Sequence, residues 1–309
     1  MRFAVLDCED APKWEGHHHL WITACGCEGD LWEHHRSFLG EYPKELESLD
    51  GLVITGSHHG VPGDHEENSE TAWIPQLATF VKDVCEKYPT VKLFGACFGA
   101  QLLAYALGGS VTANPNGKFV IGSEELQMTT AIKEREDFKY AVARSRYGTM
   151  EALPERLRLV ESHGDQVVEL PGGAQLLASS DSTPVEIWSF GHNVLCTQAH
   201  PEMTPTVMKN KIIDLFVERG RLSAMAAKLI FDTMEGIPHD SRLVLDTVRH
   251  FLRGVPPPSD TTPSKSLDEI LTRFGPMSVP FKPEDPVQNG PKLELDDEEN
   301  KELEEEVEE

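Results

Sequence analysis

The sequence predicts an α/β fold with a mostly parallel central sheet, flanking helices and a small antiparallel sheet region. In the first third of the chain, short apolar runs of the length of buried strands alternate with longer segments of helical periodicity. This alternation is typical of parallel strands joined by crossover helices, which cover both faces of a sheet. After residue 117 the apolar runs are linked by shorter connections, as they are where antiparallel strands follow one another.

The expected elements follow in order along the chain. The first strands are expected at residues 2–6, 20–24, 51–55 and 91–94, and the first helices at 71–87 and 98–107. The mixed or antiparallel region is expected to hold strands at 123–132, 156–161, 175–179, 186–189 and 194–198, the last of which returns to the main sheet. Helices are expected at 205–218, 223–234 and 241–252. A parallel sheet covered by helices in this way is flavodoxin-like.

A run of three prolines, Pro256 to Pro258, closes the regular part of the chain because consecutive prolines cannot continue a helix. We therefore expect one large domain over residues 1–255 and a proline-rich linker with an acidic tail over 256–309. Residues 284–309 hold 13 acidic residues and two lysines, close to half of the net charge of −24. Apart from one short amphipathic turn or helix expected at 266–274, the segment has few large apolar residues, so the tail is expected to be disordered.

Composition excludes several classes of function. The excess of 52 acidic over 28 basic residues argues against nucleic-acid binding, which needs clustered Lys and Arg. No apolar run approaches the ~20 residues of a membrane-spanning helix, and the N-terminal residues enter an expected strand without a signal-peptide pattern. Six cysteines in 309 residues do not make a disulfide framework. We therefore expect a cytoplasmic protein that binds neither nucleic acid nor membranes.

The strongest chemical signal is a cysteine between two glycines at the junction of an apolar strand and a helix. Gly95 and Gly99 flank Cys97 at two residues on either side. This is the nucleophile-elbow pattern with cysteine in place of serine. Glycine relieves the crowding of so tight a turn, and the following helix N-terminus favours a thiolate. Most cysteines are simply buried, but the two glycines favour a nucleophilic Cys97.

A thiol nucleophile needs an imidazole base, and the imidazole needs a group that orients it. Among 13 histidines, His200 stands at the end of an apolar strand, where ligand sites of open α/β sheets lie. Glu202 follows two residues later, a spacing that puts both side chains on one side of an extended segment. We therefore expect Cys97, His200 and Glu202 to act as nucleophile, base and orienting carboxylate.

Four blocks together resemble the class I glutamine amidotransferase domain, over roughly residues 1–253. They are Val53-Ile54-Thr55-Gly56-Ser57, Gly95-x-Cys97-x-Gly99-x-Gln101, Ser162-His163-Gly164-Asp165 and His200-Pro201-Glu202. Within this family the likeness is greatest to plant-type γ-glutamyl peptidases, through the stretch from Cys27 to Trp32 and through Phe251-Leu252-Arg253-Gly254. Ala199 departs from the usual glycine before His-Pro-Glu.

The resemblance implies a thioester mechanism on small γ-glutamyl amides, carried out by the domain 1–255. It implies that Cys97 attacks, that His200 moves the proton, and that backbone amides of Gly56 or Ser57 and of Phe98 hold the oxyanion. The residues that it assigns to the substrate pocket are Gln101, Ser162, His163, Gly164 and Asp165, with His163 and Asp165 as structural supports. It implies no cofactor.

Three functions remain open at this point. The first is a stand-alone hydrolase of glutathione-like peptides or conjugates, favoured because only ~55 residues follow the matched domain, too few for a synthetase domain. The second is a glutaminase subunit that supplies ammonia to a separate partner protein through the same residues. The third is a non-enzymatic scaffold whose acidic tail binds a basic partner, which the complete Cys–His–Glu set disfavours.

Two histidine clusters raise the question of a metal. His17, His18 and His19 are consecutive and cannot all converge on one ion, and the sequence shows no ligand cluster near them. We therefore expect no dedicated metal site: the three histidines form a polar loop before the strand at 20–24, or bind nickel only incidentally. His58 and His59 follow the Gly56 block, where they either contact a substrate carboxylate or belong to a solvated loop.

Overall fold

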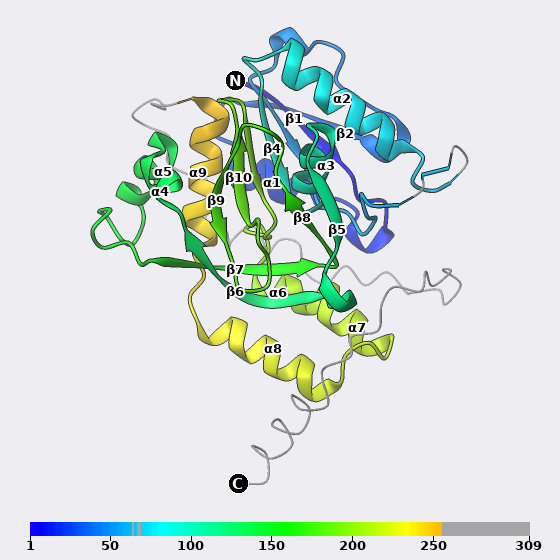
Figure 1. The fold of residues 1–309 in the computed structure, drawn as a ribbon, viewed down its shortest axis with the longest axis vertical. Helices are drawn as coiled ribbons and strands as arrows, with labels where there is room; N and C mark the ends of the chain where they lie inside the picture. The colour runs from blue at the N-terminus through cyan, green and yellow to red at the C-terminus, as the bar shows by residue number, and fades with distance from the viewer. Residues whose placement is uncertain (64, 67–68, 255–309) are drawn as a thin grey trace.

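The computed structural model describes residues 1–254 except 64, 67 and 68, and its centre is a sheet of nine strands (Figure 1). The strand order is β2-β1-β3-β4-β11-β10-β9-β6-β7. The first five of these strands are parallel, and the last four continue the same sheet in antiparallel fashion. The expected return of the last strand is confirmed, because β11 pairs with β4 in parallel.

The bounds of the strands fall into three groups. The parallel strands are β2 (Leu31–Arg36), β1 (Arg2–Asp7), β3 (Gly51–Ile54), β4 (Lys92–Ala96) and β11 (Val194–Thr197). The antiparallel strands are β10 (Ile187–Phe190), β9 (Ala174–Ser179), β6 (Val120–Met128) and β7 (Arg156–His163). A separate two-stranded antiparallel sheet consists of β5 (Ser110–Ala113) and β8 (Asp165–Glu169). The predicted fold class is confirmed, including the small antiparallel sheet.

Helices cover both faces of the parallel part. On one face lie α1 (His18–Cys25), α5 (Glu136–Arg144), which follows α4 (Thr130–Glu134), and α9 (Ser241–Arg253); their apolar residues share one core with β1, β3 and β4. On the other face lie α2 (Trp73–Lys87) and α3 (Phe98–Ala106), with a second core. Strands β1, β3, β4 and β11 are therefore shielded from water on both sides, which explains their largely apolar sequences, whereas the edge strand β2 is polar and partly exposed.

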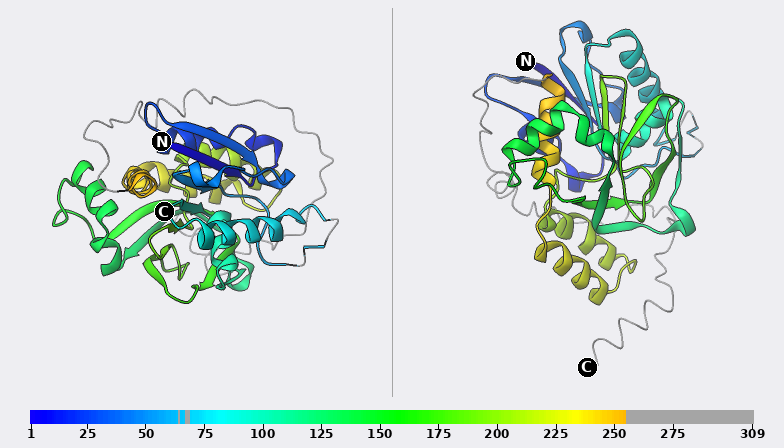
Figure 2. Two further views of the ribbon diagram at one scale, coloured as in Figure 1. Left: turned by 90° about the horizontal axis from the view of Figure 1, so that it is seen from above. Right: turned by 60° about the vertical axis from the view of Figure 1, so that its left-hand side comes forward.

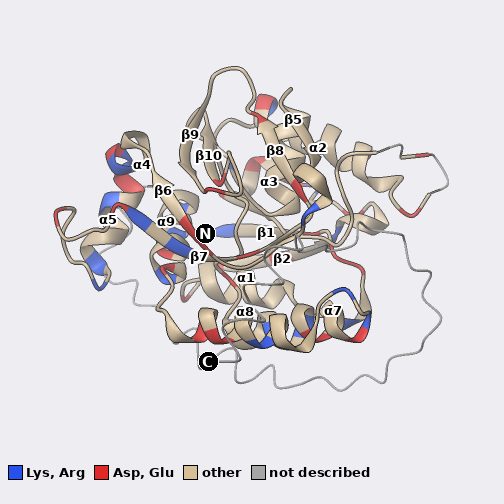
Figure 3. Ribbon diagram, turned by 60° about the horizontal axis from the view of Figure 1, so that its bottom comes forward, with Lys and Arg blue, Asp and Glu red and all other residues tan. Residues whose placement is uncertain are grey.

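A third layer lies outside β6 and β7 (Figures 1 and 2). It contains α6 (Pro205–Met208), a π-helical turn (Lys209–Ile213), α7 (Asp214–Glu218) and α8 (Ala224–Gly236). Its core includes Met208, Phe216 and Met234, packed against Val160 of β7. Lys and Arg alternate with Asp and Glu over α7, α8 and the β6–β7 pair (Figure 3), and Arg158 of β7 pairs with Glu125 of β6.

Two predictions about local structure were wrong. Residues 20–24 belong to helix α1, in which Leu20, Trp21, Ala24 and Cys25 are buried at helical spacing; a five-residue apolar run does not distinguish a helix from a strand. The strand expected at 123–132 ends at Met128, and α4 follows it. The polar edge strand β2, the strands β5 and β8, and helix α5 were not predicted.

Other expectations lie outside the described residues. These are the boundary at 255/256, the short turn or helix at 266–274 and the state of the acidic tail. Among the helices that the structure describes, none has the length and apolar character needed to cross a membrane. All six cysteines lie in the described part, and none of them forms a disulfide.

Candidate active site

Three neighbouring parallel strands, β3, β4 and β11, end at the same edge of the sheet, and each leads into one of the predicted site segments. Gly56 follows β3, Cys97 follows β4, and His200 follows β11. The three residues lie together: a Cβ added to Gly56 would be 3.2 Å from His200 Cε1 and 3.7 Å from Cys97 Cβ. The topology thus assembles at one point residues that span 144 positions of the chain, from Gly56 to His200.

Cys97 occupies a tight turn between β4 and α3. Its backbone has φ 50° and ψ −109°, and only Asn116 shares a positive φ among the described non-glycine residues. A Cβ on Gly95 would approach the Gly99 carbonyl oxygen to 2.5 Å, and one on Gly99 would approach the Ile54 carbonyl oxygen to 2.4 Å. The glycine spacing therefore reflects a close approach of strand and helix, and the strained cysteine conformation is of the kind that collects at functional sites.

His200 stands between a carboxylate and the Cys97 sulfur. Its Nδ1 is 2.8 Å from Glu202 Oε1, and both side chains are buried. Its backbone N–H donates to the Val160 carbonyl of β7 at 2.8 Å, which fixes the segment after β11. Burial by itself lowers the pKa of His200, but the negative charges of Glu202 and Cys97 and hydrogen bonds to both raise that pKa well above its ordinary value. The arrangement thus favours an imidazolium beside the sulfur.

The predicted oxyanion segments both border Cys97. Phe98 is the first residue of α3, and the first amides of a helix have no acceptor within the helix. On the other segment Gly56 faces Cys97 and His200, since a Cβ added to it would lie within 4 Å of both side chains. The Ser57 hydroxyl accepts a hydrogen bond from the backbone N–H of His59 at 3.1 Å, which shapes the turn after Gly56.

Gln101 is buried in α3, and its side-chain amide nitrogen donates hydrogen bonds to other groups of the protein. Nε2 donates to the Asp165 carbonyl at 2.8 Å and to Gln198 Oε1 at 3.0 Å. Gln101 therefore ties the elbow helix to the start of β8 and to the residue after β11. This places it as a support beneath the site.

The Ser162–Asp165 segment links β7 to β8 beside the nucleophile. The Ser162 carbonyl oxygen lies 3.9 Å from Cys97 Sγ. A Cβ added to Gly164 would lie 3.3 Å from the Phe119 ring, and a Cβ on Gly60 would be 2.6 Å from Asp165 Oδ2. Asp165, whose pKa is raised by burial, thus approaches the loop that follows Gly56. The segment connects two sides of the site.

His163 is buried and held by several neighbours. Its Nδ1 donates to the Asp165 carbonyl at 2.9 Å, and its Nε2 lies 3.4 Å from the Thr183 hydroxyl. Burial lowers the pKa of His163 to about 4. The imidazole is therefore neutral near pH 7 and acts as a structural link rather than as a proton carrier.

A buried pair of glutamates near the site was not anticipated. Glu161 of β7 and Glu186, just before β10, are both fully shielded from solvent. Burial, followed by the charge of Glu186, raises the pKa of Glu161 well above its ordinary value, and burial raises that of Glu186 to about 7. Ser180 Oγ donates to Glu186 Oε1 at 2.7 Å. The signal in the sequence was a glutamate directly beside an apolar pair in each of two strand segments, Leu159-Val160-Glu161 and Glu186-Ile187-Trp188.

The structure also brings together two groups of possible metal ligands, one with Asp7, His18 and His34 and one with Asp10, His58 and His59. The expectation that no ligand cluster lies near His17–His19 was therefore wrong, because the partners come from other strands. The loop expected before residue 20 is instead the start of α1. His58 Nδ1 lies 2.7 Å from Glu9 Oε1, and Nε2 of the buried His59 lies 3.2 Å from Asp10 Oδ1, so acidic side chains hold both histidines.

Ala199, which replaces the usual glycine, is fully buried without strain, since its φ is not positive.

Comparison with known proteins agrees with this arrangement. Residues 4–219 match the family model of glutamine amidotransferase class-I. The chain is 34% identical to γ-glutamyl peptidase 4 of Arabidopsis thaliana over 82% of its own length and 94% of the relative's, and 31% identical to γ-glutamyl peptidase 3 of that plant over 81% and 94%. A crystal structure of a glutamine amidotransferase from Thermotoga maritima shares the fold, with a TM-score of 0.58, 18% identity and coverage of 82% and 99%. The chain belongs to the class I glutamine amidotransferase family.

Proposed function

We propose that this protein is a cysteine hydrolase that cleaves γ-glutamyl amide bonds through a thioester on Cys97. The observation that carries the proposal is the joint placement of Cys97, His200 and Glu202 at the end of adjacent parallel strands, with Gly56 against the first two. The family assignment and the relatives named γ-glutamyl peptidases support the same chemistry.

In the first half-reaction the Cys97 sulfur attacks the γ-carbonyl carbon, and the carbonyl oxygen becomes an oxyanion. Backbone amides of Gly56 or Ser57 and of Phe98 are proposed to hold that oxyanion, a type of interaction worth roughly 3–4 kcal/mol per donor. The His200 imidazolium then gives its proton to the leaving amine, and the C–N bond breaks. The products are a free amine and a γ-glutamyl thioester.

In the second half-reaction neutral His200 accepts a proton from water, whose oxygen attacks the thioester carbonyl. Collapse of the tetrahedral intermediate breaks the C–S bond, releases the γ-carboxylic acid of glutamate and returns the thiolate. Glu202, hydrogen-bonded to Nδ1, keeps Nε2 directed at the reacting groups and stabilises the imidazolium, which is re-formed once per turnover.

For the substrate we propose glutathione-like peptides or their conjugates. The support is the likeness to γ-glutamyl peptidases over nearly the whole length of those relatives. The elbow and the triad do not discriminate between a peptide amine and ammonia as leaving group. A glutaminase that hands ammonia to a partner protein is therefore the competing outcome of the test.

The test compares kcat/KM for glutathione, a glutathione S-conjugate and glutamine under one set of conditions, with separate assays for released dipeptide and released ammonia. We expect the peptides to be preferred, and Cys97→Ala to abolish every reaction. Cys27→Ala serves as the control, because this cysteine is partly exposed and lies outside the site. A preference for glutamine that appears only after a second protein is added would support the ammonia-supplying subunit instead.

A further inference from the structure

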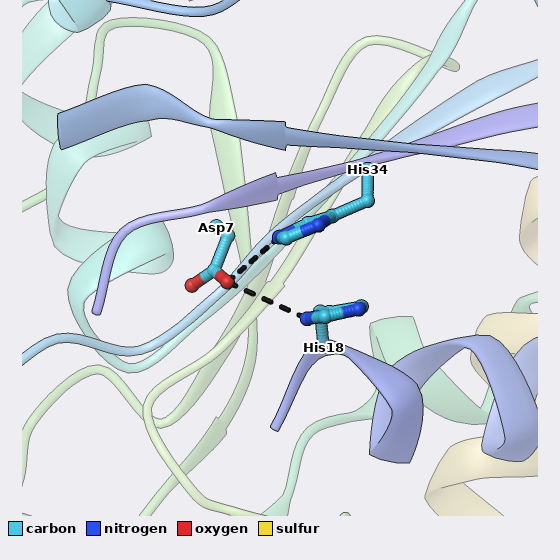
Figure 4. Close-up of side chains that lie close together, drawn as sticks. All are labelled: Asp7, His18 and His34. Carbon is cyan, nitrogen blue, oxygen red and sulfur yellow. Dashed lines mark hydrogen bonds and ion pairs between the residues drawn. The ribbon is translucent and has the colours of Figure 1, made fainter. Parts of the chain in front are cut away.

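Three side chains from different elements converge at the carboxyl end of β1, as Figure 4 shows. Asp7 ends β1, His34 lies in the adjacent strand β2, and His18 lies in the first turn of α1. Asp7 Oδ2 is 2.9 Å from His34 Nε2 and 3.6 Å from His18 Nδ1. One ligand atom from each residue lies within 4.8 Å of the other two. A single ion between them would therefore need only small side-chain movements to reach all three.

The fold orients these side chains independently of the proposed active site. In β2 successive side chains point to opposite faces, so His34 faces α1 while Glu33 and His35 share the other face and contact each other at 3.2 Å. Helix α1 packs over β1 on the His34 side through Trp21 and Ala24. His18 thus reaches Asp7 from above the sheet, and His34 reaches it from the neighbouring strand.

Hydrogen bonds alone do not satisfy all the polar atoms of this cluster. His34 Nε2 can donate to Asp7, but His18 Nδ1 is buried, has no hydrogen-bond partner, and is too far from Asp7 Oδ2 for a hydrogen bond. The His18 and His34 rings stack with centroids 3.5 Å apart and planes at 11°. Two parallel imidazoles aimed at one carboxylate oxygen would repel each other if both were protonated. A cation shared by the two nitrogens and the carboxylate would satisfy all three groups.

A transition metal binds the lone pair of an imidazole nitrogen and the oxygen of a carboxylate. The atoms of this cluster that lie near one another are His34 Nε2, 2.9 Å from Asp7 Oδ2, and His18 Nδ1, 3.6 Å from the same oxygen. The cluster therefore presents two ring nitrogens and one carboxylate oxygen to a shared ion.

His17 is close to the cluster but is not counted as a ligand. Its Nδ1 lies 3.6 Å from Asp7 Oδ1, yet it donates to the Trp14 carbonyl at 3.2 Å and so carries the proton. Two imidazoles and one carboxylate leave a coordination position open for water. This donor set suits Zn²⁺ and the neighbouring divalent ions, and not Mg²⁺ or Ca²⁺, which prefer oxygen ligands only.

We propose that Asp7, His18 and His34 form a binding site for one divalent transition-metal ion of the Zn²⁺ type. The ion would join α1 to β1 and β2. The side chains are 7%, 13% and 31% exposed, so the opening to solvent is on the His34 side.

The experiment measures Zn²⁺ binding to the full chain, free of any purification tag, by isothermal titration calorimetry and by the shift in melting temperature. Two features of the chain compete for zinc: the Cys97–His200 pair and the group of Asp10, His58 and His59. All titrations are therefore repeated with Cys97→Ser and with His58→Gln. Comparing variants that carry the same acidic tail removes any contribution from that tail.

We expect the wild-type chain to bind one tight equivalent of Zn²⁺ and to melt at a higher temperature with the ion. His18→Gln and His34→Gln should each weaken that equivalent at least tenfold. His35→Gln, on the same strand but the opposite face, should leave it unchanged, as should Cys97→Ser and His58→Gln. Co²⁺ in the same site should show the absorption of nitrogen and oxygen ligands without a thiolate charge-transfer band.

The proposal is wrong if His18→Gln and His34→Gln, each verified as folded by circular dichroism, bind Zn²⁺ as tightly as the wild type. It is equally wrong if the tight equivalent disappears in Cys97→Ser or in His58→Gln, because the ion would then belong to one of those sites. If one of the two histidine variants does not fold, the other alone decides.

Discussion

His200 Nδ1 and Glu202 Oε1 are 2.8 Å apart, and the two side chains are shielded from solvent at the end of a strand that pairs with the strand leading to Cys97. The carboxylate therefore acts on the proposed nucleophile only through the imidazole. Because Glu202 contacts His200 and His200 faces Cys97, loss of the Glu202 side chain and loss of the His200 side chain should affect activity differently.

We expect His200→Ala to reduce kcat/KM by about 10³–10⁴-fold, because the imidazole performs both proton transfers. Glu202→Gln should reduce it less, since it removes orientation and charge but no proton carrier. Steady-state rates of both purified variants check the order. If the glutamine variant were as damaged as the alanine variant, Glu202 would have a more direct part in the reaction.

The pH–rate profile gives a second readout of the same pair. Because the charge of Glu202 contributes to raising the pKa of His200, Glu202→Gln should shift the His200-dependent limb of the profile to lower pH. Asp246→Asn, on the distant helix α9, serves as a control that should leave the limb in place. An unshifted limb in Glu202→Gln would mean that Glu202 does not set the proton affinity of His200.

Gly56 and Gly99 should respond differently to alanine. A Cβ on Gly99 would meet the Ile54 backbone oxygen at 2.4 Å, which cannot yield without moving β3, so Gly99→Ala should lower the free energy of unfolding by roughly 1–3 kcal/mol or more. A Cβ on Gly56 meets only His200 Cε1 and Cys97 Cβ, at 3.2 and 3.7 Å. Gly56→Ala should therefore keep its stability and lose activity. Denaturant unfolding and kcat/KM, measured on both variants, test this contrast.

The buried glutamate pair should make the protein less stable as pH rises. Glu186 has a folded pKa of about 7, raised above the ordinary value of 4.5 mainly by burial, and burial also raises the pKa of Glu161 well above that ordinary value. Their contribution to stability is therefore fully present below about pH 4.5 and is lost as pH rises through about 7. Between pH 5 and 8, Glu186→Gln should flatten the decline in the free energy of unfolding by about 1 kcal/mol or more.

The control for that experiment is Glu235→Gln, at an exposed position in α8, which should leave the slope unchanged. A wild-type slope in Glu186→Gln would show that the pair is not protonated in the folded protein, contrary to its burial.

The parts of the site that sequence alone predicted are those encoded over short distances. The glycine spacing around Cys97 reports the contact of strand and helix directly, and the two-residue spacing of His200 and Glu202 reports a shared side of an extended segment. The fold class was also predictable, because the alternating strand and helix patterns are encoded over short stretches of sequence.

What sequence did not predict depends on pairings between distant segments. Asp7 meets His34 only because the polar segment 31–36 forms an edge strand beside β1, and its composition gave no strand signal. His18 meets them only because residues 18–25 form a helix where a loop and a strand were expected. Likewise, the burial of Glu161 and Glu186 depends on the packing of β7 against its neighbours rather than on local pattern.

The central claim is that Cys97 carries a γ-glutamyl thioester, and the most direct measurement is the intact mass of the protein, quenched with acid during turnover of glutathione. The account predicts a fraction of molecules heavier by one γ-glutamyl group, on the peptide that contains Cys97, and no such fraction in Cys97→Ala. Turnover by folded Cys97→Ala at the wild-type rate, or an adduct on a different residue, would contradict it.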